Sequence, residues 1–143
     1  AKLSYNPGIE AALVAATKTG LASMPAQTVK GQPVVLKTAK TDMKGIVNLN
    51  RLVGIHEQAV VYGYAEVDSI HARDAVLKIG SDDGVAVWLN GVKVHTHDVA
   101  RGHNAGDDEV KVHLSEGTNR LLVKVHNQAG GWAFSVAIPQ PTF

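Results

Sequence analysis

The dipeptide Asn90-Gly91 is the feature that most narrows the folds open to this chain. A two-residue type I′ turn needs positive φ at both central positions, and Asn followed by Gly meets that need well. Apolar side chains alternate with others on either side of the dipeptide, in residues 85–89 and 92–95. Alternation with a period of two indicates strands with one buried face. The sequence therefore predicts a tight antiparallel β-hairpin here.

The turn also sets the register of the hairpin, because each residue before it faces a defined residue after it. In that register apolar residues oppose apolar residues on one face. The predicted pairs are Leu89 with Val92, Val87 with Val94, and Trp88 with Lys93. Trp88 points away from the core side of its strand, so we expect its indole to be partly exposed unless a loop covers that face of the sheet.

A second turn, Ser81-Asp82-Asp83-Gly84, places two carboxylates side by side between two apolar strands. Adjacent like charges are unfavourable unless hydrogen bonds, water or a cation compensate. In one interpretation the pair accepts hydrogen bonds from the loop's own amides, and Arg101 or Lys93 offsets the charge. In the other interpretation the pair binds a hard cation such as Ca²⁺, which prefers oxygen ligands. Residue types leave both open and favour the first, because Asp-rich turns are common in all-β proteins.

The rest of the chain adds strands and one helix. Residues 6–20 carry a proline at the helix start, an acidic first turn and a terminal glycine, which predict the only helix. Strand signals then recur from Pro33–Lys37 onward, and no helix separates them. A second hairpin is predicted through Glu116-Gly117, with Val112 opposite Leu121. The predicted fold class is all-β, an antiparallel β-sandwich with a short N-terminal helix.

Residues that share the inward parity on these strands form the predicted core. They are Leu77, Ile79, Val85, Val87, Leu89, Val112, Leu121, Val123, Val125 and Phe134. The other face of these strands should meet solvent. It carries Lys111, His113, Lys124 and His126.

Length and composition predict a single module over residues 1–143, with residues 1–32 as an extension packed on the sandwich or leading into it. A net charge of +1 and an aromatic content of 5% argue against a nucleic-acid partner. No apolar stretch is long enough to span a bilayer, so we expect no membrane partner. We expect the chain to be a module of a longer, exported protein.

Patterns for catalysis and for zinc binding are weak. The chain has no Gly-x-Ser-x-Gly elbow, and a small sandwich offers little depth for a cleft, so we do not expect an enzyme. His95 and His97 share a strand face, but zinc needs three or four convergent ligands and the other histidines lie elsewhere. We therefore expect no zinc site. The loop 96–108 is long and polar, as functional loops tend to be, and carries Arg101.

The run Gly80-Ser81-Asp82-Asp83-Gly84-Val85, followed by Val87-Trp88-Leu89-Asn90-Gly91, resembles the core motif of galactose-binding-like jelly-roll modules. That group includes the protective-antigen-type domains of bacterial toxins, glycosidases and yeast flocculins. The motif is a stronger signal of fold than of function, because one fold hosts many roles. The similarity continues through residues 47–52, 59–65, 99–102, 119–127 and 130–134.

The resemblance implies a lectin-like, non-catalytic carbohydrate-binding accessory module of a larger protein that is secreted, periplasmic or at the cell surface. In protective-antigen-type lectins, an aspartate pair in the matching loop binds Ca²⁺, which coordinates sugar hydroxyls. Asp82 and Asp83 match that pair and are the predicted calcium ligands. With Trp88 and Arg101 they form the predicted binding site for a glycan or polysaccharide.

The alternative is a structural spacer that packs on neighbouring domains of the parent chain and binds no sugar. A small hydrolase is a third, weaker alternative.

Overall fold

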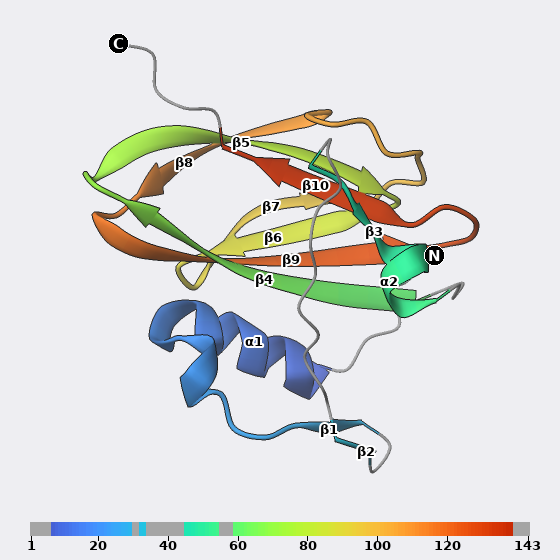
Figure 1. Ribbon diagram of the computed structural model, residues 1–143, viewed down its shortest axis with the longest axis horizontal. Helices are drawn as coiled ribbons and strands as arrows, with labels where there is room; N and C mark the ends of the chain where they lie inside the picture. The colour runs from blue at the N-terminus through green and yellow to red at the C-terminus, as the bar shows by residue number, and fades with distance from the viewer. Residues whose placement is uncertain (1–6, 30–31, 34–44, 55–58, 139–143) are drawn as a thin grey trace.

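The computed structural model describes residues 7–29, 32–33, 45–54 and 59–138. Two four-stranded antiparallel sheets face one another, and helix α1 lies against the outside of one of them (Figure 1). One sheet has the strand order β3-β10-β5-β8, and the other has the order β4-β9-β6-β7. The predicted antiparallel β-sandwich is confirmed.

The elements have the following bounds. The first sheet contains β3 (Val47–Asn48), β10 (Ala133–Ala137), β5 (Arg73–Asp82) and β8 (Asp108–Leu114). The second contains β4 (Ala59–Ser69), β9 (Gly117–Asn127), β6 (Val85–Leu89) and β7 (Val92–His97). Outside the sandwich lie α1 (Pro7–Thr19), the 3₁₀ turn η1 (Leu21–Ser23), and the short pair β1 (Thr28–Val29) and β2 (Gln32–Pro33). Most of the strand predicted at Pro33–Lys37 falls outside the described residues.

Helix α1 confirms the predicted N-terminal helix, and the chain leaves it at Gly20 with φ +100°. A second helix, α2 (Leu49–Val53), was not predicted. Its five residues are too few to show a helical period, but its start is marked by Asn48, whose side chain accepts a hydrogen bond from Arg51 N at 3.1 Å. No described helix has the length and apolar character needed to cross a membrane.

The core lies between the two sheets and contains the residues predicted for it. Leu77, Ile79, Val87 and Val125 are completely buried. Phe134 is only partly buried, yet it packs against the same cluster. Its ring lies over Gly63 of the opposite sheet, where an added Cβ would come within 3.1 Å of the ring.

The Asn90-Gly91 hairpin is confirmed, with φ +50° at Asn90 and +86° at Gly91. Two of the three predicted pairs are also confirmed: Trp88 faces Lys93 and Leu89 faces Val92. The third is wrong, because the register shifts between Val87 and Trp88 and places His95 opposite Val87. An irregularity of this kind adds one residue to one strand and so displaces every pair beyond it.

The second predicted hairpin is wrong. β8 pairs with β5 and not with β9, so Val112 faces Ala75 and Glu109 faces Lys78. The predicted inward face of β8 is unchanged, because Val112 is still buried in the core. What differs is the sheet to which β8 belongs, and residue alternation does not encode that choice.

The buried side chain of Asn119 makes hydrogen bonds to the connection between β8 and β9. Its side-chain oxygen accepts hydrogen bonds from Ser115 N and from the Asn90 side chain, both at 2.9 Å. Its amide group donates to Ser115 O at 2.9 Å and to Gly117 O at 3.2 Å. One side chain therefore fixes the point at which the chain passes between the sheets.

Helix α1 covers the outer face of the sheet β4-β9-β6-β7. Leu13 of the helix joins a second apolar cluster with Ala86, Trp88 and Leu122 of the sheet. Beside this cluster, Lys124 Nζ lies 2.8 Å from Glu10 Oε1 in α1. This face of the sheet is therefore packed against the helix.

The predicted exposure of two residues on β9 is wrong, since Lys124 and His126 are both buried. Alternation assumes that one face of a strand meets water, and β9 is covered on both faces. Neither ring nitrogen of His126 has a hydrogen-bond partner among the described residues, and burial lowers its pKa. Lys111 and His113 are exposed as predicted.

Candidate functional site

The turn Asp82-Asp83-Gly84 lies at one rim of the sandwich, where the chain leaves β5 in one sheet and enters β6 in the other. The Asp82–Asp83 peptide bond is cis. Asp83 N donates to His126 O at 2.8 Å, and His126 N donates to Gly84 O at 2.9 Å. On the other side, Asp82 pairs with Ala133 of β10. Both sheets therefore hold the backbone that carries the two carboxylates.

Asp83 is buried, and its carboxylate joins two other segments to the turn. Oδ1 accepts a hydrogen bond from Arg101 N at 3.1 Å, and Oδ2 accepts one from Gln128 N at 2.7 Å. Its own carbonyl accepts from Ser81 Oγ at 2.7 Å. Hydrogen bonds to an ionised acceptor are the stronger kind. Asp83 thus ties the loop after β7 and the end of β9 to the rim.

Asp82 lies in a different environment from its neighbour. Burial raises the pKa of Asp82 to about 6, and the negative charge of Asp83 and a side-chain hydrogen bond with Asp83 add to the rise. No cation of the described residues is among the groups that shift it. Gly131 passes so close that an added Cβ would lie 2.7 Å from Asp82 Oδ2. Asp82 is therefore a half-buried carboxyl group whose negative charge no cation of the described residues offsets.

Arg101 does not neutralise the aspartate pair with its guanidinium group. Nε donates to Ser81 O at 3.0 Å and Nη2 donates to Ser81 Oγ at 2.8 Å. The same group donates a hydrogen bond to each carboxylate oxygen of Asp108, from Nη1 to Oδ1 at 2.9 Å and from Nη2 to Oδ2 at 3.0 Å. Only its backbone amide reaches Asp83. Arg101 therefore connects the rim to a second acidic centre at Asp108.

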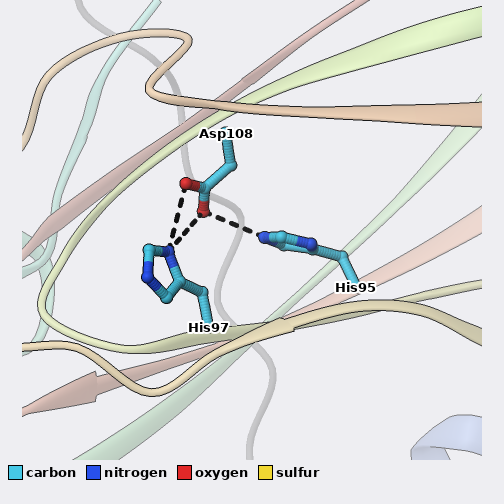
Figure 2. Close-up of side chains that lie close together, drawn as sticks. All are labelled: His95, His97 and Asp108. Atoms are coloured by element: carbon cyan, nitrogen blue, oxygen red, sulfur yellow. Dashed lines mark hydrogen bonds and ion pairs between the residues drawn. The ribbon is translucent and has the colours of Figure 1, made fainter.

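Two histidines complete the surroundings of Asp108, as Figure 2 shows. His95 Nε2 lies 2.9 Å from Asp108 Oδ2, and His97 Nδ1 lies 3.1 Å from Oδ1 and 3.3 Å from Oδ2. Burial disfavours the charge on Asp108, but hydrogen bonds from Arg101, His95 and His97 outweigh it and hold the pKa of that carboxyl well below its usual range. Because β7 and β8 belong to different sheets, this cluster bridges the two layers.

The structure brings three of the four predicted site residues together and leaves one apart. Asp82, Asp83 and Arg101 share the rim. Trp88 lies under α1 and is only 5% exposed, with Lys93 Nζ 5.2 Å from the ring centroid. The expectation that Trp88 is partly exposed is wrong, because the helix covers the face to which it points. A ligand would reach Trp88 only if α1 moved.

Sequence reasoning missed the group formed by His95, His97 and Asp108. His95 and His97 share a strand face, but their third partner is an aspartate that follows a long loop. The remaining histidines lie on other segments, so the histidine pattern gives no third ligand. An aspartate at the first residue of the next strand, directly after a polar loop, was the available signal.

Comparisons with known proteins show the fold. No protein-family model matches the chain, and a search of curated proteins finds no match. A β-glucosidase from Kluyveromyces marxianus, solved in complex with glucose, is similar over 82% of this chain and 14% of its own, with 11% identity and a TM-score of 0.50. The likeness at this identity concerns the fold alone.

Two smaller sandwich structures are also similar. They are the PA14 domain of the MpAFP antifreeze protein, at 21% identity and a TM-score of 0.44, and a family 35 carbohydrate-binding module from Clostridium thermocellum, at 14% identity and a TM-score of 0.42. The match covers 56% of this chain and 41% of the antifreeze-protein chain, and 72% of this chain and 87% of the module. The chain thus spans less than half of the first two chains named here.

Proposed function

We propose that the chain is a non-catalytic carbohydrate-binding module whose glycan site is the rim at Asp82 and Asp83, assisted by Ca²⁺. The observation that carries the proposal is the pair of adjacent carboxylates at the rim, where Asp83 accepts hydrogen bonds from two backbone amides and no cation of the described residues lowers the pKa of Asp82. A bound cation would remove this unfavourable charge pair, since an opposite charge nearby favours the ionised form.

The donor chemistry fits calcium better than a softer ion. Both rim side chains offer carboxylate oxygens, and Ca²⁺ takes six to eight oxygen ligands. Each Asp83 oxygen accepts one backbone hydrogen bond and keeps a further lone pair for a cation. A site with so few carboxylates should bind in the weak range of about 10⁻⁴–10⁻³ M that extracellular modules use. That range fits the exported location we propose for the parent protein.

The carbohydrate part of the proposal rests on the motif in residues 80–91, which resembles that of sugar-binding jelly rolls. It also fits the sandwich fold shared with a β-glucosidase. Hydroxyl oxygens of a glycan would fill positions on the cation that the protein leaves open. Arg101 stabilises the loop beside this position through its contacts with Ser81 and Asp108.

A spacer that packs on neighbouring domains is the alternative, and the hydrogen bonds of Asp83 favour it. That carboxylate already accepts hydrogen bonds from two backbone amides, which is a structural role that needs no ligand. The two functions differ at Asp82, whose side chain accepts no backbone hydrogen bond among the described residues and which the calcium site requires as a ligand.

Calcium titration followed by thermal unfolding separates them. At a tenfold excess over Kd, calcium should stabilise the chain by about 1.4 kcal/mol, which raises Tm by about 3–6 °C. Asp82→Asn should abolish the rise, and Asp107→Asn, an equal change of charge at an exposed position, should preserve it. If calcium leaves Tm unchanged in the unaltered chain, the calcium site is refuted.

A further inference from the structure

His95, His97 and Asp108 form a second group of potential metal ligands, distinct from the oxygen-rich rim. One nitrogen from each histidine and a carboxylate oxygen of Asp108 all lie within 4.8 Å of one another. Among the described residues this is the one group of three or more such side chains. We propose that it binds a divalent transition-metal ion of the zinc class.

Two of the three distances between donor atoms are close to those around such an ion, and the third, between the two histidine nitrogens, is within 4.8 Å. Zinc lies about 2.0–2.2 Å from nitrogen and oxygen ligands, so tetrahedral ligand atoms are about 3.3 Å apart. Asp108 Oδ2 lies 2.9 Å from His95 Nε2 and 3.3 Å from His97 Nδ1. The two contacts of Asp108 therefore need adjustments of only a few tenths of an ångström to admit the ion. Two imidazoles and one carboxylate suit zinc, whereas calcium selects oxygen ligands.

The backbone presents these side chains from regular strands. His95 and His97 stand two residues apart on β7 and therefore point to the same face, and Asp108 is the first residue of β8. The His97 side chain is 44% exposed, which gives an ion a route from solvent. Three protein ligands leave a fourth position for water or another small ligand.

His97 Nδ1 also has conflicting neighbours in the absence of an ion. Two acceptor oxygens of Asp108 lie within 3.3 Å of it, and a donor, Arg101 Nη1, lies 3.4 Å away. A ring nitrogen either donates or accepts, so it satisfies only one side. An ion would use the nitrogen lone pair and the Asp108 oxygen together.

Arg101 is the competitor for this site. Its guanidinium group occupies both oxygens of Asp108 and holds a positive charge beside the ligand nitrogens. An ion at Oδ2 would displace the Nη2 hydrogen bond, while Nη1 could remain on Oδ1. Removing the charge should therefore raise metal affinity, and a purely structural ion pair predicts no such gain.

The test is isothermal titration of the tag-free chain with Zn²⁺, supported by the absorption spectrum of Co²⁺ as a probe of coordination. We expect one equivalent to bind. His97→Gln should weaken binding by about 100-fold or more, since even outer partners of a metal ligand are worth about 10–100-fold. His113→Gln is the matched control, because His113 also contacts an aspartate, Asp74, at 3.1 Å but belongs to no group of three such side chains among the described residues. It should leave the affinity unchanged.

Arg101→Gln should tighten binding by about tenfold through loss of the repelling charge. This gain cannot arise from misfolding, which removes a site. Asp82→Asn should not affect zinc, so failure of the rim proposal and failure of this one are distinguishable. The inference is overturned if millimolar Zn²⁺ produces no binding heat, if His97→Gln binds as the unaltered chain does, or if Arg101→Gln binds zinc no more tightly.

Discussion

Replacing each rim aspartate by asparagine in turn should shift the stability of the calcium-free chain in opposite directions. The two substitutions are chemically identical and adjacent, so size and net charge cancel in the comparison. What differs is the local environment: Asp83 accepts two backbone hydrogen bonds, and Asp82 is a carboxylate whose charge is not offset.

Asp83→Asn replaces one acceptor oxygen by an NH₂ group, which then faces a backbone N–H. The loss of one hydrogen bond to a charged acceptor costs about 1.5–3 kcal/mol. For a domain of this size that cost corresponds to a fall in Tm of about 4–10 °C. Asp82→Asn loses no such bond and removes a repulsion, so we expect a gain of about 1 kcal/mol at pH 7 once solvent screening is allowed for.

The sign of the pH dependence follows from the raised pKa of Asp82. Its pKa is about 6 in the folded chain against an ordinary value of 3.8, so the folded state holds this proton more tightly. Stability attributable to Asp82 is therefore greatest below the ordinary value and is lost as pH rises through about 6. The advantage of Asp82→Asn should appear over that interval and vanish at acidic pH.

Urea unfolding in the presence of a chelator, repeated across this pH range, measures both effects. Asp107→Asn controls for the loss of one negative charge at an exposed position. Equal changes of the same sign for Asp82→Asn and Asp83→Asn, at every pH, would refute the different roles assigned to the two carboxylates.

Three further substitutions test the fold. Leu121→Ala should cost about 2–5 kcal/mol in urea unfolding, as loss of a buried leucine does; an unchanged midpoint would contradict the core assignment. Gly91→Val should lower Tm strongly, because φ is +86° and an added Cβ would clash with the Lys18 side chain; a Tm equal to that of the unaltered chain would argue against the turn. Glu10→Ala should cost about 3 kcal/mol, because it removes the carboxylate that lies 2.8 Å from the ammonium group of buried Lys124; unchanged stability would argue against the packing of α1 on the sheet.

Local alternation and turn chemistry were sufficient to predict the sandwich. Asn90-Gly91 sets its turn through backbone sterics that act within a few residues. In strands such as 77–79 and 121–125, the alternation of apolar residues is enough to show which side chains point into the core. These features are encoded locally, and a single sequence shows them.

Features that depend on distant partners could not be predicted in the same way. The pairing of β8 with β5 leaves its residue alternation unchanged, so nothing in β8 itself reveals its sheet. Burial of Trp88 and Lys124 depends on where α1 docks. The aspartate pair is adjacent in the sequence and visible there, whereas Asp108 meets His95 and His97 only because a loop returns the chain to the side of β7.

Glycan-array binding, with and without a chelator, tests the proposed function most directly. We predict that the chain binds at least one glycan in calcium, that chelation removes the signal, and that Asp82→Asn removes it while Asp107→Asn retains it. Absence of binding to any glycan, or binding that survives both chelation and Asp82→Asn, would contradict a calcium-assisted carbohydrate site at the rim.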